Sequence, residues 1–296
     1  ATAALESLLN KDDYVQDIVD ILVPVYEMNG RKDKVGELFV HRLRTAQSDS
    51  EKVQLYKDLA LHHESVTEDS GAAFDAYLNA FSIDPSEGTL LYELERLAGT
   101  LGAWESLSDT VEKVAGDSNT DPSQAVELWI KVAHWAAGNL GDPVRAEKMY
   151  RKVISKEPGH VEALSSLEIL LKSLGKFKEL IPIMKQRAEG IYDFATKKDL
   201  YLEIADVARN ELSNIDEAKK AYLEIREMDE SDLDAIDALI VISQEQKDAE
   251  TQASLLMSRS DYTSDMIDSN KFLHNAAELY LGPLSDMDLA IDLYRR

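Results

Sequence analysis

Residues 126–160, VELWIKVAHWAAGNLGDPVRAEKMYRKVISKEPGH, contain the pattern that decides the fold. Apolar side chains that include Trp129 and Ala133 recur at the spacing of one helix face, which predicts a first helix. After a short break, Asp142 is followed by proline, and this pair favours the start of a second helix because aspartate caps it well. Pro158 ends that helix, since proline cannot continue it. The stretch therefore predicts two helices joined by a turn.

The same features return along the chain every 72 or 73 residues. Tyr150 has counterparts at Tyr77, Tyr222 and Tyr294, and an alanine stands four residues before each of them. The further columns with this spacing are Ala73, Ala146, Ala218 and Ala290; Ala60, Ala133, Ala205 and Ala277; and Tyr56, Trp129, Tyr201 and Leu273. Residues Asp69, Asn214 and Asp286 occupy the capping position of Asp142. Such self-similarity indicates a repeat architecture.

A second helix pair follows in each period. The segment 160–188, HVEALSSLEILLKSLGKFKELIPIMKQRA, carries an apolar stripe through Leu164 and Leu171, and Gly175 ends the helix before the next stripe begins. In the fourth copy the pattern weakens over residues 243–252, where no glycine occupies the turn. Each period thus holds one regular and one more degenerate pair.

The regular pairs resemble the tetratricopeptide repeat (TPR), which has two antiparallel helices in about 34 residues. The matching residues are Ala133, Ala146, Tyr150 and Pro158, and one period earlier Ala60, Ala73, Tyr77 and Pro85. In the next copy Glu230 replaces the proline, and the alternate pairs have Leu180 and Met184 where alanine and an aromatic residue are expected. The first alanine also stands one residue farther from the second than is usual in the family. Long bacterial TPR arrays show a similar alternation.

The resemblance and the repeat together predict an all-α protein, an α-solenoid of about eight antiparallel helix pairs wound as a right-handed superhelix. One pair cannot bury its apolar stripe alone, so neighbouring pairs must stack. We expect a single array over 1–296. Its expected parts are a partial double repeat at 1–50, double repeats at 51–122, 123–195 and 196–267, and a truncated unit at 268–296.

Composition narrows the classes of function. The chain has 32 lysines and arginines against 56 aspartates and glutamates, a formal net charge of −24. This charge opposes binding to nucleic acid or to anionic membranes, and no stretch is apolar enough to cross a bilayer. The absence of cysteine excludes disulfides and thiolate metal sites but does not fix the compartment, for which the cytoplasm is slightly favoured over the periplasm.

The sequence favours neither a catalytic nor a metal site. It has no nucleophile motif, phosphate loop or dinucleotide fingerprint, and His63-Glu64 lacks the second histidine of a zinc-protease helix. We therefore expect no enzyme activity, no cofactor and no metal. Trp129 and Trp135 would form either an aromatic platform or part of the core, and the repeat column that Trp129 shares with Tyr56 and Tyr201 favours packing.

Two alternatives remain open for the charge distribution. Residues 145–190 are rich in lysine and arginine, and residues 229–268 are rich in acidic side chains. Both bands would be either ordinary solvated surface or surfaces that steer partners.

The TPR resemblance implies that the first helix of each pair lines a concave groove that binds a protein or peptide. The candidate groove residues are Lys57, Leu61, Tyr92, Arg96, Ile130, His134, Ser165, Ile169, Lys172, Leu202 and Asp206. The Lys/Asn clamp with which some relatives hold a peptide's terminal carboxylate is missing, so binding of chaperone tails is not predicted.

The predicted function is that of a non-enzymatic protein-interaction scaffold. The alternatives are an architectural element that stacks end to end, or an accessory domain of a larger protein. The first alternative rests on Ala290, Ile291 and Tyr294, which leave an apolar stripe uncovered at the last helix and allow self-association through the solenoid ends.

Overall fold

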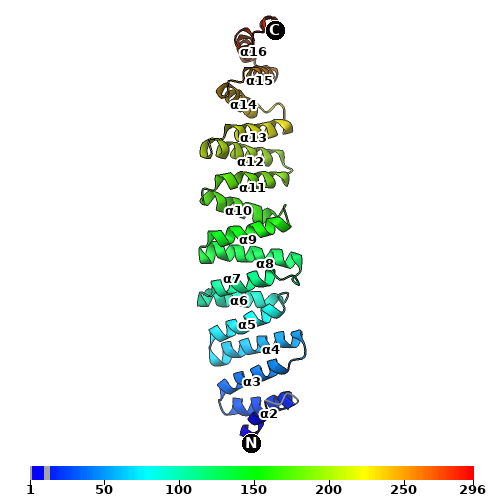
Figure 1. Ribbon diagram of the computed structural model, residues 1–296, viewed down its shortest axis with the longest axis vertical. Helices are drawn as coiled ribbons and strands as arrows, with labels where there is room; N and C mark the ends of the chain where they lie inside the picture. Colours follow the sequence, from blue (N-terminus) through cyan, green and yellow to red (C-terminus); the bar gives the residue numbers. More distant parts are fainter. Residues whose placement is uncertain (1, 10–13) are drawn as a thin grey trace. The chain divides into compact units, whose positions relative to one another are not determined.

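A computed structural model describes residues 2–9 and 14–296, and within these ranges it contains seventeen α-helices and three short π-helices (Figure 1). The all-α fold class is confirmed. The chain divides into two compact units, residues 1–156 and 157–296, and each is described by itself. The division falls within the expected double repeat 123–195, between its regular and its degenerate pair. The single continuous array stays a prediction.

Unit 1 consists of a short first helix and four antiparallel helix pairs. Within it, each α-helix packs against the next along the chain. The pairs are α2/α3, α4/α5, α6/α7 and α8/α9. The elements are α1 (Thr2–Leu8), α2 (Val15–Met28), α3 (Lys32–Thr45), α4 (Asp49–His62), η2 (His63–Thr67), α5 (Ser70–Ile83), α6 (Gly88–Leu101), α7 (Trp104–Ala115), α8 (Pro122–Trp135), η3 (Ala136–Leu140) and α9 (Pro143–Lys156).

Unit 2 repeats this plan with four further pairs, α10/α11, α12/α13, α14/α15 and α16/α17. Its elements are α10 (Val161–Ser173), α11 (Phe177–Glu189), α12 (Phe194–Asp206), η4 (Val207–Glu211), α13 (Ile215–Met228), α14 (Leu233–Glu245), α15 (Ala249–Asp261), α16 (Met266–Leu281) and α17 (Met287–Arg295). Consecutive α-helices again pack against each other. Each unit is therefore an α-solenoid of TPR-like helix pairs.

The repeated alanines lie at the seams between helices. All eight residues of the two alanine columns are 0–1% exposed. Tyr77 and Tyr150, which follow these alanines, are 4% and 3% exposed, and Trp129 is 8% exposed. Because alanine adds little bulk, the paired helices approach closely and the aromatic rings fill the space beside them. The predicted interior positions are confirmed in these copies.

The second helix of each regular pair begins at the predicted cap. The side chains of Asp69, Asp142, Asn214 and Asp286 accept hydrogen bonds from the backbone N–H three residues later, at 2.9–3.1 Å. These caps satisfy a backbone donor that the helix itself leaves unpaired.

The extra residue in each regular pair is accommodated by a wider helical turn. The backbone N–H of each capping residue also donates to the carbonyl six residues earlier, at 2.8–2.9 Å. In three copies this turn is a π-helix, η2, η3 or η4, which continues the first helix. A π-turn holds one residue more than an α-turn. This geometry accounts for the alanine spacing that is one residue longer than the family pattern.

The turn without a glycine keeps the geometry of its glycine-containing equivalents. Lys247 has φ = +57°, where Gly102 and Gly175 have +68° and +64°. The following backbone N–H donates to the carbonyl five residues earlier in both turns, Asp248 to Ser243 and Lys176 to Leu171, each at 2.9 Å. The sequence pattern weakens here, but α14 and α15 form as in the other copies.

Replacing Lys247 with glycine is expected to raise the free energy of unfolding by about 1 kcal/mol. A side chain in the left-handed region costs about 1–2 kcal/mol, and the greater freedom of glycine in the unfolded chain offsets part of this gain. Urea denaturation followed by circular dichroism measures the change. The reverse substitution, Gly175→Lys, should destabilise by a similar amount. A Lys247→Gly variant that is less stable than the wild type would contradict this prediction.

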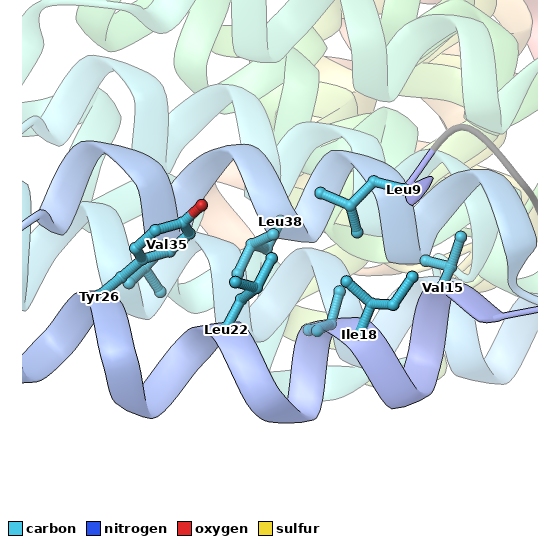
Figure 2. Close-up of a cluster of buried hydrophobic side chains, with 8 residues drawn as sticks. Leu9, Val15, Ile18, Leu22, Tyr26, Val35 and Leu38 are labelled. Atoms are coloured by element: carbon cyan, nitrogen blue, oxygen red, sulfur yellow. The ribbon is translucent and has the colours of Figure 1, made fainter. Parts of the chain in front are cut away.

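A hydrophobic cluster joins the first three helices of unit 1. One face of α2 carries Ile18, Leu22 and Tyr26, which pack with Leu38 of α3 and with Leu9 just beyond α1 (Figure 2). The Tyr26 hydroxyl donates a hydrogen bond to the Glu6 carboxylate. Burial of the ring, helped by this bond to Glu6, raises the pKa of Tyr26 to about 12. The cluster ties α1 to the first helix pair.

Candidate functional site

The first helices of successive pairs in unit 1 are connected by ion pairs. We call the exposed side chains of α4, α6 and α8, with the π-turns that extend them, the first-helix face of unit 1. Three ion pairs cross it: Lys57 Nζ to Glu87 Oε1 at 3.4 Å, Arg96 Nη2 to Glu64 Oε1 at 2.5 Å, and Lys131 Nζ to Glu95 Oε1 at 2.9 Å. The structure thereby brings Lys57 and Arg96, two predicted groove residues, onto one surface.

Large apolar side chains stand between these ion pairs. Leu61, which follows Lys57 by one turn of α4, is 55% exposed, and Tyr92 of α6 is 67% exposed. His134 at the end of α8 is also exposed, and its ring lies edge-on to the Tyr150 ring with centroids 6.1 Å apart. These positions are open to a partner.

Ile130, which was predicted to line the groove, does not lie on the accessible part of this face. Its side chain is only 8% exposed, so it belongs to the core of unit 1. The helical spacing placed Ile130 one turn before His134, but the neighbouring helices cover it. The sequence pattern of α8 alone could not show that neighbouring helices bury this side chain.

Unit 2 has an equivalent surface, the first-helix face of unit 2, formed by α10, α12 with η4, and α14. Here each bridge runs from a basic residue to the next first helix along the chain. Lys172 Nζ lies 2.5 Å from Glu203 Oε1, Lys198 Nζ lies 3.0 Å from Asp234 Oδ2, and Arg209 pairs with Glu245.

The predicted residues of unit 2 differ in their exposure. Ile169 is 69% exposed, Ser165 and Leu202 are half-buried, and Asp206 is exposed and accepts a hydrogen bond from the Asn210 amide at 2.5 Å. Val241 of α14, 46% exposed, was missed. It stands 72 residues after Ile169 in the same repeat column, and this spacing was the signal that could have found it.

Ion pairs favour the charged form of three basic groups on these faces, Arg96, Lys172 and Lys198. Hydrogen bonds from Arg96 to Glu64 and Glu93 raise the pKa of its guanidinium. A bond to Asp232 does the same for the pKa of Lys198. Burial alone would lower the pKa of Lys172, but the carboxylates of Glu203 and Glu168 outweigh it and raise the value. These cations thus form ion pairs within the protein.

Most basic side chains of the band predicted at 145–190 form ion pairs with acidic side chains of the protein itself. Arg145 pairs with Asp109 at 2.8 Å, and Lys148 and Lys152 both contact Glu112, at 2.8 and 3.2 Å. Seven of its ten basic residues form such ion pairs: Arg145, Lys148, Arg151, Lys152, Lys172, Lys185 and Arg187. Except for the Arg151–Glu147 pair within α9 and the Lys172–Glu168 pair within α10, these contacts join neighbouring helices.

The tryptophans are packing residues. Trp129 and Trp135 are 8% and 6% exposed. The Trp135 ring lies 6.0 Å from the Trp104 ring, and Lys152 Nζ lies 5.4 Å from the centre of the Trp129 ring. An exposed aromatic platform at these positions is excluded.

The described residues offer little for metal or small-molecule chemistry. No group of three or more metal-binding side chains occurs among them, and no helix in that part of the chain could span a membrane. His63 contacts the Thr67 hydroxyl at 3.2 Å, and Glu64 is held by Arg96. A cavity of about 610 Å³ lies at the ends of α5 and α7, the loop before α8 and Gln124 in the first turn of α8.

Of the three residues in the apolar stripe predicted on the last helix, α17, Ile291 and Tyr294 are exposed, whereas Ala290 is 0% exposed and belongs to the alanine seam. Tyr294 is 46% exposed, although its counterparts Tyr77 and Tyr150 are 4% and 3% exposed. Leu289 and Ile291 are 41% and 40% exposed. Self-association through this surface stays a prediction.

No family model and no curated protein matches the sequence. Among solved structures, a tetratricopeptide repeat protein from Parabacteroides merdae is 12% identical, with 83% of this chain and 98% of that chain covered and a TM-score of 0.36. The structure of Naa15/Naa10 bound to HypK-THB is 14% identical, covers 95% of this chain and 44% of that one, and has a TM-score of 0.40.

YrrB, described as a TPR protein with an unusual peptide-binding site, is 17% identical. It covers 79% of this chain and 96% of its own, with a TM-score of 0.28. All three TM-scores lie below 0.5, so the TPR-like character of the array rests on the helix pairs of this chain: their antiparallel packing, alanine seams and caps.

Proposed function

We propose that the protein is a non-enzymatic scaffold that binds a segment of another protein along its first-helix faces. The stacked pairs supply a firm support, because consecutive helices pack against each other within each unit. Several charged groups of the faces form bridges between helices, and these bridges position the surface. We also propose that these first-helix faces correspond to the concave groove of the TPR family.

The observation that carries the proposal is that Leu61 and Tyr92 are both exposed and lie beside the ion pairs that connect α4 and α6. Exposed aromatic and aliphatic side chains within a polar rim are typical of the anchor positions of protein interfaces. Lys57 and Glu64 bracket Leu61 along α4 and η2, and these two residues pair with Glu87 and with Arg96 of α6. A partner side chain placed here would bury both apolar groups.

Affinity capture with paired variants tests the proposal. In unit 1 we expect Leu61→Ser with Tyr92→Ser to reduce the recovery of bound proteins at least tenfold, because truncating interface anchors costs about 2 kcal/mol or more. The matched control is Val144→Ser on the second helix α9, whose side chain is 71% exposed. It should leave recovery unchanged. If the Leu61/Tyr92 variant, correctly folded by circular dichroism, captured every protein as the wild type does, the first-helix face of unit 1 would be excluded.

A further inference from the structure

We infer that the first-helix face of unit 2 binds a cationic peptide segment that also carries apolar side chains. The inference rests on the proposed function and specifies the chemistry of the partner. It follows from three observations. Charge is divided unequally between first and second helices, certain carboxylates have no cationic partner among the described residues, and exposed apolar groups lie beside these carboxylates.

The first helices carry a more negative net charge than the second helices. In unit 2, α10, α12 with η4, α14 and α16 carry eleven acidic and five basic side chains, whereas α11, α13, α15 and α17 carry ten and eight. Unit 1 shows a stronger contrast, with ten acidic and four basic side chains on α2, α4 with η2, α6 and α8, against seven and ten on α3, α5, α7 and α9. Among the helices, the excess of acidic over basic side chains therefore lies on the first helices, which include those of the two faces proposed to bind a partner.

Of the four basic side chains on α10, α12, η4 and α14, three already form bridges in the described part of the chain and Lys197 does not. The nine acidic side chains of these helices leave carboxylates in excess. Lys172, Lys198 and Arg209 each bridge to the next first helix. Asp199 and Asp206 of α12 lie on the exposed surface, and neither forms an ion pair with a basic side chain of the described residues. A cation placed beside these two carboxylates would gain a charge-assisted contact without breaking an existing bridge.

Apolar side chains flank these carboxylates on the neighbouring first helices. Ile169 of α10 is 69% exposed and Val241 of α14 is 46% exposed, and both occupy the same position of the double repeat. Leu202 of α12, half-buried, follows Asp199 by about one turn. A segment lying across α10, α12 and α14 would meet apolar, acidic and apolar groups in turn.

This arrangement selects one class of occupant. An acidic segment would face the uncompensated carboxylates and be repelled, and a purely apolar one would bury them without a partner, which is costly. A purely basic segment would leave Ile169 and Val241 exposed. A segment with lysine or arginine beside leucine-like side chains satisfies both kinds of group, and its affinity should fall as salt rises.

Fluorescence anisotropy with three synthetic peptides tests this inference on the full chain. The first peptide carries lysines and leucines in a glycine–serine background. In the second the lysines are glutamates, and in the third the leucines are serines. We expect the first to bind most tightly. Asp199→Asn with Asp206→Asn should weaken its binding about tenfold, and Ile169→Ser with Val241→Ser should do so as well.

The matched control removes two exposed acidic groups from second helices, Glu227→Gln of α13 and Glu250→Gln of α15. This variant has the same net charge as Asp199→Asn/Asp206→Asn and should bind the first peptide like the wild type. Equal weakening by both variants would show a general charge effect and overturn the inference, as would a preference for the glutamate peptide. If Ile169→Ser with Val241→Ser lost captured proteins while Asp199→Asn/Asp206→Asn kept them, the cationic chemistry would be wrong and the scaffold function would stand.

Discussion

Tyr150→Ala is expected to lower the free energy of unfolding of unit 1 by about 3–5 kcal/mol, the cost of deleting a large aromatic side chain from a packed core. Tyr150 is 3% exposed and belongs to the column that fills the space beside the alanine seam. Its removal would leave a cavity between α8 and α9, since the 0%-exposed alanines nearby cannot fill it.

Tryptophan fluorescence during urea denaturation reports this change for the correct unit, because Trp104, Trp129 and Trp135 all lie within residues 1–156. Tyr92→Ala is the control, because it removes the same side chain from the same unit at a position that is 67% exposed. Its effect should stay within about 0.5 kcal/mol. Equal losses for the two variants would show that burial in the repeat column does not determine the contribution of Tyr150.

The parts of the fold that followed from sequence are those set by local, repeated signals. Alanine columns, capping residues and the turns at Gly102 and Gly175 are dictated by the space or the backbone angle at one position, so their residue types identify them. Eight helix pairs occur in the described residues, as the repeat indicated.

Other features depend on interactions that residue type does not reveal. Lys247 adopts a positive φ without being glycine, because the surrounding helices impose the turn. At Glu230, where the closing proline is missing, α13 still ends at Met228. There Asp229 accepts hydrogen bonds from the backbone and hydroxyl of Ser231, at 2.9 and 2.7 Å, as Asp84 does with Ser86 beside a proline. The aspartate–serine turn was the missed signal.

The sequence predicted which residues of the candidate site stand on first helices, but it did not predict how exposed their side chains are. The repeat placed Leu61, Tyr92 and Ile169 on first helices, and all three are more than half exposed. It placed Ile130 there too, although neighbouring side chains bury it. Register follows from one helix, whereas exposure depends on what the adjacent helices contribute. The division of charge between first and second helices became visible only when each charged residue was assigned to its helix.

Ion pairs between successive helices explain how so acidic a chain still forms packed units. A bridge such as Lys131–Glu95 contributes little by itself, because surface ion pairs are typically worth about 0–1 kcal/mol. Because several such bridges occur in each unit, however, they place cations between carboxylates that would otherwise repel one another. Stability comes mainly from the apolar seams, and the bridges determine where uncompensated negative charge remains.

Ala146→Leu is expected to destabilise unit 1 by about 1–3 kcal/mol, the usual effect of adding methylene groups to a core without space for them. Ala146 is 0% exposed and lies in α9, which packs against α8 with Ala133 on the facing seam. A leucine there would push the two helices apart or take an unfavourable rotamer. The same substitution at Ala137, exposed in η3, provides the control and should change stability by about 0.5 kcal/mol at most. Thermal unfolding followed by tryptophan fluorescence measures both variants. An Ala146→Leu protein as stable as the wild type would mean that the seam has room for a larger side chain, and the close approach of paired helices would no longer explain why alanine recurs there.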